Sequence, residues 1–289
     1  MASIKAIRRR IASVKSTQQI TRAMKLIAAA RLRRAQEALL SARPYAETLA
    51  RVAESLLESE KALLEPREEA RAQSLIVVIA SDRGLCGAYN SNAVRKGEEI
   101  ARHQVAANLA PAYFPVGRKA VEHFKRAKVS IGGESVGNQP LATVKLARAI
   151  GTRMLSDYLS GAVRETGIIY SRFKSALAQT PVYERVLPLP SPEELKEQHG
   201  PEVVEYLIEP SRSALVPIVL QSYVESAVFH ALLEAEASDN AAKMTAMDAA
   251  TNNAEEMITQ YTLEMNRARQ AAITSELMDI VGGSEALRE

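Results

Sequence analysis

Residues 218–281 read IVLQSYVESAVFHALLEAEASDNAAKMTAMDAATNNAEEMITQYTLEMNRARQAAITSELMDIV and contain neither glycine nor proline. Because those two residues are the ones that interrupt helices, the stretch predicts one continuous helix of roughly 95 Å. Small and apolar residues recur in it at spacings of three and four, which is the pattern of a coiled-coil seam. The seam residues are Met244, Met247, Thr251, Ala254, Ile258, Tyr261, Met265, Ala268 and Ala272. Beyond them the strict heptad is lost, so we expect the last turns to extend past the partner helix.

The N-terminal residues supply a matching helix. With Ile4 at position a and Ile7 at position d, the heptads run without glycine or proline as far as residue 42. The a positions are Ile4, Ile11, Gln18, Lys25, Leu32 and Leu39, and the d positions are Ile7, Val14, Thr21, Ala28, Ala35 and Ala42. Polar seam residues at Gln18, Thr21 and Lys25 cost stability but fix the register of a coiled coil. Pro44 predicts a kink or a new turn, with residues 47–57 continuing the helix.

Charge is spread unevenly over the 289 residues. Ten lysines and arginines precede the first acidic residue, Glu37, whereas residues 225–289 carry twelve acidic and four basic residues. The two ends are therefore electrostatic opposites, which favours their pairing. The basic start also has the composition of a mitochondrial presequence, but the heptads continue past Arg34 and indicate structure instead. The single cysteine, Cys86, excludes an intramolecular disulfide and indicates a reducing compartment. The sequence contains no run of 18 apolar residues, so we expect no membrane-spanning helix.

Between the two helical arms, short apolar runs alternate with helical patterns. We expect strands at 75–80, 112–116, 128–131, 166–171, 182–187 and 203–208, and helices at 90–105, 118–127 and 141–163. Residues 179–181 are the expected hairpin turn. Strands that alternate with helices predict an α/β domain with a mostly parallel sheet. The predicted division is an N-terminal arm at 1–70, an α/β domain at 71–210 and a C-terminal arm at 211–289.

Enzymatic motifs are weak in this chain. The turn Ser81-Asp82-Arg83-Gly84-Leu85-Cys86-Gly87-Ala88-Tyr89-Asn90 follows a strand and precedes a helix, where α/β proteins bind phosphate, but its glycine spacing matches neither a dinucleotide fingerprint nor a P-loop. Cys86 has no histidine in a recognisable catalytic constellation, and the four histidines form no metal-binding pair. Two alternatives stay open: a dinucleotide-dependent enzyme with helical oligomerisation arms, and a coiled-coil nucleic-acid binder that uses the basic N-terminal face.

Three segments of the chain together resemble one family. They are residues 10–25 (RIASVKSTQQITRAMK), residues 81–90 quoted above, and residues 267–277 (RARQAAITSEL). The chain resembles the γ subunits of F-type ATP synthases over its full length, and its Met1 start is similar to the bacterial type. Asp239 and Lys243 depart from the pattern, because relatives usually have Glu and Arg there. The missing cysteine-pair insertion implies that thiol regulation of the photosynthetic kind is absent.

The resemblance implies a fold in which the two arms form a long antiparallel coiled coil with an inserted Rossmann-like α/β domain. It implies the function of a central rotor shaft, which couples proton flow through the membrane c-ring to ATP synthesis and hydrolysis at the β subunits of the α/β hexamer. Such a subunit is not an enzyme and needs no cofactor or metal. Its partners would be the α, β and ε subunits and the c-ring. Its place would be peripheral, on the cytoplasmic face of the bacterial plasma membrane, with no nucleic-acid partner.

The resemblance also assigns contact residues. On the shaft, the residues matched to β-subunit contacts are Met24, Lys25, Arg269, Gln270, Thr274 and Glu276. In the α/β domain, Tyr206 and Glu209 match the region that touches the c-ring and ε.

Overall fold

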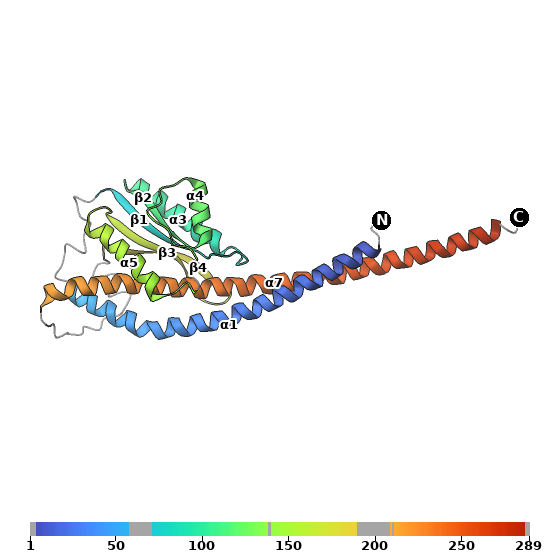
Figure 1. The fold of residues 1–289 in the computed structure, drawn as a ribbon, viewed down its shortest axis with the longest axis horizontal. Coiled ribbons are helices and arrows are strands. Elements are labelled where there is room, and N and C mark those ends of the chain that lie inside the picture. The colour runs from blue at the N-terminus through green and yellow to red at the C-terminus, as the bar shows by residue number, and fades with distance from the viewer. Residues whose placement is uncertain (1–3, 58–70, 138–139, 190–208, 210, 287–289) are drawn as a thin grey trace. The chain divides into compact units, whose positions relative to one another are not determined.

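The computed structural model describes residues 4–57, 71–137, 140–189, 209 and 211–286. The chain begins with helix α1 (Ile4–Leu57) and ends with helix α7 (Arg212–Ala286), as Figure 1 shows. Residue contacts divide the chain into two compact units. The coiled-coil unit comprises Met1–Ile27 and Met244–Glu289, and the α/β unit comprises Ala28–Lys243, so that both helices contribute to both units.

Both predicted long helices are confirmed. Helix α1 continues through Pro44 to Leu57, and α7 is one helix of 75 residues. Helix α7 begins at Arg212 rather than Ile218, with Pro217 in its second turn, where the missing N–H removes a single backbone hydrogen bond. It also continues past the predicted end at Val281.

The heptad pattern is confirmed by burial. Every a and d position of α1 from Ile4 to Ala42 is buried or half-buried, and so is every predicted seam residue of α7 from Met244 to Ala272. In the coiled-coil unit, Thr21 contacts Thr251 and Lys25 contacts Asp248, so residue numbers rise on one helix as they fall on the other. The two helices are therefore antiparallel.

The α/β unit contains a four-stranded sheet in the order β2-β1-β3-β4. Its strands and helices follow in sequence as β1 (Gln73–Ile79), α3 (Tyr89–Ala106), β2 (Ala110–Val116), α4 (Arg118–Ala127), α5 (Val144–Leu159), β3 (Glu165–Phe173) and β4 (Gln179–Leu187). Strands β2, β1 and β3 are parallel, and β4 pairs antiparallel with β3. The Rossmann-like, mostly parallel sheet is therefore confirmed.

Both faces of the sheet are covered. Leu75, Val77 and Ile79 of β1 pack with residues of α5 and α7, whereas Ile76 and Val78 pack with residues of α3 and α4. Successive residues of a strand point to opposite faces, and a strand covered on both faces is apolar throughout. This explains why β1 reads as an unbroken run of aliphatic residues.

Three local predictions are wrong. Residues 128–131 form no strand, because Lys128 adopts a left-handed conformation that ends α4 and Ile131 makes only an isolated bridge to Tyr113. The third inner helix is shorter than 141–163, since Thr143 caps it through Leu146 N at 3.2 Å and Gly161, at φ +71°, follows its end. The predicted turn residues 179–181 belong to β4, where Pro181 is tolerated because β4 lies at the edge of the sheet. The predicted strand at 203–208 lies outside the described residues.

One described helix, within Ala214–Val281, is long and apolar enough to pass a length-and-composition test for a membrane span. Core helices of soluble proteins pass the same test. In α7, Leu220, Val224 and Val228 are at most 2% exposed and belong to the core of the α/β unit. These buried residues account for part of the apolar character of α7, and 28% of its most apolar 18-residue window is buried.

Candidate functional site

A polar layer interrupts the apolar seam of the coiled-coil unit. The hydroxyls of Thr21 and Thr251 are 2.8 Å apart, and Lys25 Nζ donates to Asp248 Oδ1 at 2.5 Å. Thr251 Oγ1 also lies 2.7 Å from its own helix's Met247 carbonyl, to which it can donate. The predicted register-fixing residues Thr21 and Lys25 thus each have a partner on α7.

The predicted β-subunit contacts occupy two separate surfaces. Met24 and Lys25 are half-buried on α1 beside the polar layer. The other four, on α7, are exposed: Arg269, Gln270, Thr274 and Glu276. At 1.5 Å per residue, about 30 Å of helix separates Asp248 from Arg269, so the structure does not bring the two groups together.

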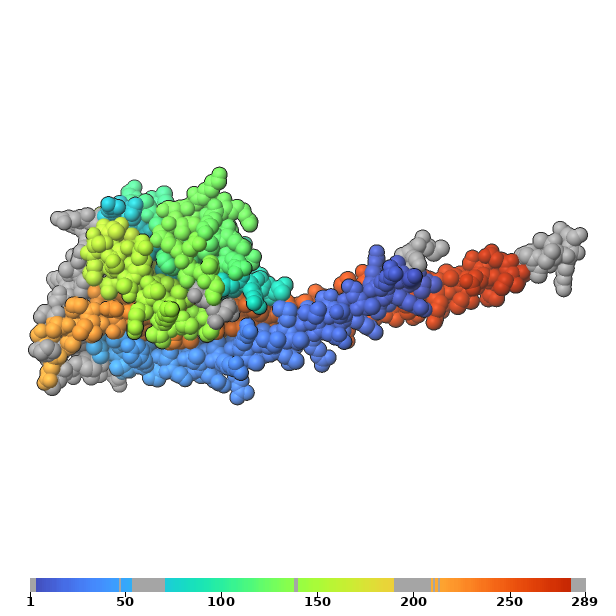
Figure 2. All heavy atoms as spheres, in the orientation of Figure 1, coloured from blue at the N-terminus to red at the C-terminus, as the bar shows by residue number. Residues whose placement is uncertain are grey.

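The last turns of α7 carry exposed apolar side chains. Five of them are 49–69% exposed: Ile273, Leu277, Met278, Ile280 and Val281. In the face seen in Figure 2, the red end of α7 continues past the blue start of α1, as the loss of the heptad after Ala272 predicts. Rows of exposed apolar residues of this kind are typical of interaction surfaces.

The basic residues of α1 face outward. Of the ten that precede Glu37, only Lys25 is half-buried, and the others are exposed. This confirms that the seam and the charged face lie on different sides of the helix. Of the two residues matched to c-ring and ε contacts, Glu209 is exposed, and Tyr206 lies outside the described residues.

The turn after β1 contains an internal anion at a position where α/β proteins bind phosphate. Asp82 Oδ1 accepts hydrogen bonds from Arg118 N, at the start of α4, at 2.8 Å and from Gly137 N at 3.3 Å. Helix N-termini favour negative charge, and here the carboxylate supplies it. Asn90 Oδ1 similarly accepts from Ser81 N at 2.9 Å. Side chains of this turn therefore bind backbone amides of the turn itself, of Gly137 and of the start of α4.

Cys86 is unsuited to nucleophilic catalysis. Its side chain is 2% exposed, and Asn90 Nδ2 donates to Sγ at 3.1 Å. Burial, followed by the charge of Asp239, raises the pKa of the thiol above its ordinary value, so the thiolate is disfavoured.

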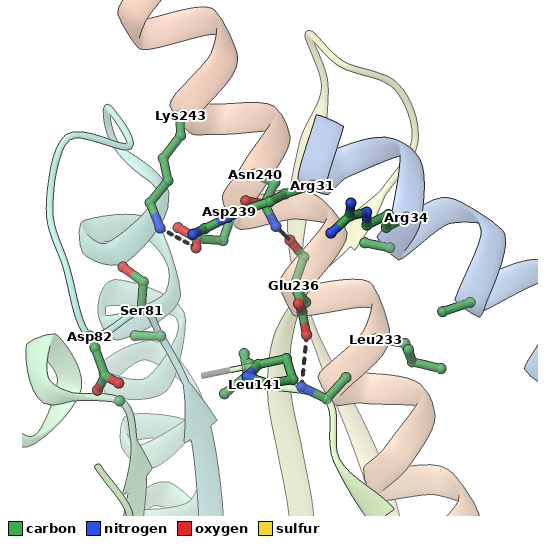
Figure 3. A pocket seen from close by; sticks show the side chains of 16 residues that line it. Arg31, Arg34, Ser81, Asp82, Leu141, Leu233, Glu236, Asp239, Asn240 and Lys243 are labelled. Carbon is green, nitrogen blue, oxygen red and sulfur yellow. Dashed lines mark hydrogen bonds and ion pairs between the residues drawn. The ribbon is translucent and has the colours of Figure 1, made fainter. Parts of the chain in front are cut away.

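A cavity of about 550 Å³ in the α/β unit has a strongly charged lining. Figure 3 shows that Arg31 and Arg34 of α1 lie on one side and that Ser81 and Asp82 lie on the other, with α7 between. The acidic side chains are already engaged, because Glu236 Oε2 accepts from Ala142 N at 2.8 Å and Asp82 binds the start of α4. Among the described residues, no group of three or more His, Cys, Asp or Glu could hold a metal ion.

Asp239 is the most constrained charge in this lining. Its Oδ2 accepts from Lys243 Nζ at 2.5 Å, whereas its buried Oδ1 has no hydrogen-bond partner among the described residues. Burial raises the pKa of Asp239, and Lys243 opposes that effect. Asp239 and Lys243 therefore pair with each other within one helix.

Sequence reasoning missed the residues that join α7 to the sheet. Glu234 Oε2 accepts from Phe173 N at 2.6 Å, and Ser238 Oγ donates to Ser171 O at 2.7 Å. The available signal was a pair of glutamates, Glu234 and Glu236, in an otherwise alanine- and leucine-rich stretch. A buried acid in such a stretch needs a donor, and here backbone amides provide it.

Comparison with known proteins places these features in a family. A family model described as ATP synthase matches residues 3–287. The ATP synthase gamma chain of Desulforamulus reducens is 45% identical over 291 residues, covering 99% of this chain and 100% of the relative. That of Moorella thermoacetica is 43% identical, covering 100% of both.

Solved structures with the same fold include chains of two mitochondrial ATP synthases. One, from the Euglena gracilis OSCP/F1/c-ring structure, has a TM-score of 0.71 and 21% identity, and the match covers 98% of this chain and 94% of that one. Another, from the Tetrahymena thermophila central stalk/c-ring structure, has a TM-score of 0.60 and 26% identity, with 80% and 99% covered. The sequence identity over the whole length and the shared fold agree, and the chain therefore belongs to the ATP synthase gamma chain family.

Proposed function

We propose that the chain turns as the central rotor shaft of an F-type ATP synthase and couples proton flow through a c-ring to ATP synthesis and hydrolysis at the β subunits of an α/β hexamer. As a gamma chain it is a non-catalytic stalk subunit. The observation that carries the proposal is α7, a continuous helix of 75 residues whose register against α1 is held by paired polar residues. In a shaft that transmits torque, the two helices must not slide past each other.

The proposed partners follow from the surfaces. The exposed apolar end of α7 suits a sleeve formed by α and β subunits, and the outward basic face of α1 suits acidic loops of that sleeve. The ε subunit and the c-ring are the proposed partners of the segment 71–210, whereas segments 1–70 and 211–289 form the shaft. The Euglena structure contains F1 and a c-ring, and the Tetrahymena structure contains the central stalk and a c-ring, of those proteins.

The proposed β-subunit contacts are the two surfaces described above. Arg269, Gln270, Thr274 and Glu276 are exposed and free to meet a passing loop. Lys25 is 39% exposed while paired with Asp248, so it can offer only part of its ammonium group to a partner. Tyr206 and Glu209 remain the proposed contacts with the c-ring and ε.

The complex is membrane-associated, and this chain is a peripheral part of it. We place it on the cytoplasmic face of a bacterial plasma membrane, because the gamma chains of Desulforamulus reducens and Moorella thermoacetica, to which it is 45% and 43% identical, come from bacteria.

Co-expression tests the proposal. The chain is produced with the α and β subunits of its own organism, and the purified complex is weighed by native mass spectrometry. We expect three α, three β and one copy of this chain, with ATPase activity that requires the chain. A free monomer or a homo-oligomer that never associates with α and β would contradict the proposal.

A further inference from the structure

One segment of α7 is buried around nearly its whole circumference. Of the twelve residues Ala231–Ala242, which we call the collar segment, all are buried except Glu236, which is half-buried. A surface helix normally buries one stripe and leaves the opposite side in water. The collar segment lies wholly within the α/β unit, so this unit encloses the helix rather than resting against one side of it.

Hydrogen bonds from separate parts of the α/β unit reach the collar segment. The end of β3 is held twice, because Glu234 accepts from Phe173 N and Ser238 donates to Ser171 O. The residues that precede α5 are held through Glu236, which accepts from Ala142 N at 2.8 Å. The start of α3 is held by the Tyr89 hydroxyl, which donates to Ala235 O at 3.1 Å.

These attachments lie on opposing sides of the helix. Successive residues of an α-helix are about 100° apart, so the side chains of Glu234 and Glu236 project about 200° apart. Ser238 lies about 40° from Glu234 on the same side. Turning α7 about its axis inside the α/β unit would therefore break hydrogen bonds on both sides at once, and the amides of Phe173 and Ala142 would each lose a carboxylate acceptor.

Close packing adds a second attachment nearer the start of α7. A Cβ atom at Gly151 of α5 would lie 3.1 Å from Glu225 Cα, so α5 approaches the backbone of α7 directly. Arg148 of α5 also donates to Glu225 Oε2 at 3.4 Å. This second attachment lies more than one turn before the collar segment.

We propose that the collar segment is where torque passes between the α/β unit and α7, with Glu234, Glu236 and Ser238 as the positioning residues that stop α7 from turning inside the unit. This inference rests on the proposed rotor function, since torque has meaning only in a rotating complex. It assigns to these residues a mechanical role in coupling that is separate from contact with any other subunit.

The test uses the assembled synthase in vesicles and a bead on the α/β unit. Because Cys86 is buried and Arg126 of α4 is exposed, an Arg126→Cys substitution provides a selective thiol for attaching the bead. Two readouts are taken: protons pumped per ATP hydrolysed, and the angular variance of the bead in complexes stalled between steps.

The variants are Glu234→Ala/Glu236→Ala, the conservative Glu234→Gln, and the milder Tyr89→Phe/Ser238→Ala. Glu37→Ala, which removes an exposed glutamate of α1, is the matched control.

We expect the double alanine variant to raise the angular variance at least twofold and to lower the pumping ratio, with Glu234→Gln and Glu37→Ala close to wild type. If the double alanine variant does not assemble, the Tyr89→Phe/Ser238→Ala variant takes its place in the test. It is also expected to raise the angular variance and to lower the pumping ratio. If the variant used in the test assembles and its angular variance and pumping ratio equal those of the wild type, the torque inference is overturned and the proposed function is unaffected. A wild-type complex that neither hydrolyses ATP nor pumps would instead overturn the proposed function.

Discussion

Lys25 of α1 pairs with Asp248 of α7 across 223 positions of sequence, with 2.5 Å between Nζ and Oδ1. Sliding one helix by a turn would set Met244 or Asn252, according to the direction, opposite the lysine and would also separate Thr21 from Thr251. The pair therefore belongs to a single register of the coiled coil.

A double-mutant cycle on Lys25→Ala and Asp248→Ala measures this pair. Because the side chains are 39% and 46% exposed, we expect a coupling of only about 0.2–1 kcal/mol. The exchanged variant Lys25→Asp/Asp248→Lys should retain most of the stability, whereas Lys25→Asp alone should lose more than Lys25→Ala. The measurement is urea unfolding of the purified chain followed by circular dichroism. Strictly additive effects would show that the pair does not hold the register.

Gly117→Ala should disrupt the α/β unit. Gly117 has a φ of +90°, and a Cβ atom there would lie 2.1 Å from the carbonyl oxygen of Ala80. We expect a loss of about 3 kcal/mol or more in unfolding free energy, measured by denaturant titration. Gly84→Ala, in the same region and with no atom within 4 Å of its added Cβ, is the control and should cost much less. Equal stability of the two variants would contradict this account of the turn.

Arg269→Ala should weaken coupling or slow turnover of the assembled complex while leaving the nucleotide affinity of isolated β subunits unchanged. A charged contact that is partly desolvated in one dwell of the rotation is worth about 1–3 kcal/mol. Steady-state ATPase and proton-pumping assays give the result. Arg267→Ala removes the same group about 200° around α7 and serves as the comparison. Unaltered turnover and coupling in Arg269→Ala would count against the assigned contact.

Alkaline pH should destabilise the chain. Burial raises the pKa of Tyr89, Tyr170, Tyr183 and Tyr223 above the ordinary value of 10.0. Each folded-state pKa is raised, so the stabilisation is complete below about pH 10 and is lost as the pH rises and the unfolded chain ionises. Tyrosinate absorbance and circular dichroism, recorded together over an alkaline titration, should therefore change together for these residues. Their ionisation without loss of helical signal would contradict the prediction.

The regular parts of this chain were predictable because each depends on neighbours in sequence. The seam from Ile4 to Ala42 follows from a heptad, and α4 occupies the predicted residues 118–127, with Gly117 before it and the left-handed Lys128 after it. The prediction of a strand at 128–131 also used only neighbouring residues, and it was wrong. Its short apolar content could not reveal that Lys128 ends a helix with a positive φ.

The attachments between distant segments were not predictable. Nothing near Lys25 indicates that Asp248 is its partner, since the pairing depends on the register of two whole helices. Glu234 and Glu236 resemble solvated charges in sequence, yet their acceptor oxygens bind backbone amides that only the folded sheet brings near them. The sequence shows which polar groups would need hydrogen-bond partners if buried, but the partners themselves depend on the tertiary fold.

The uncovered aliphatic row at the end of α7 also bears on how a cell must handle this polypeptide. Copies made in excess of their sleeve would expose Ile273, Leu277 and Ile280 to water and to one another. Such copies would tend to self-associate and precipitate. Solubility therefore favours synthesis in step with the α and β chains, so that stoichiometry is a condition for keeping the subunit in solution as well as for building the machine.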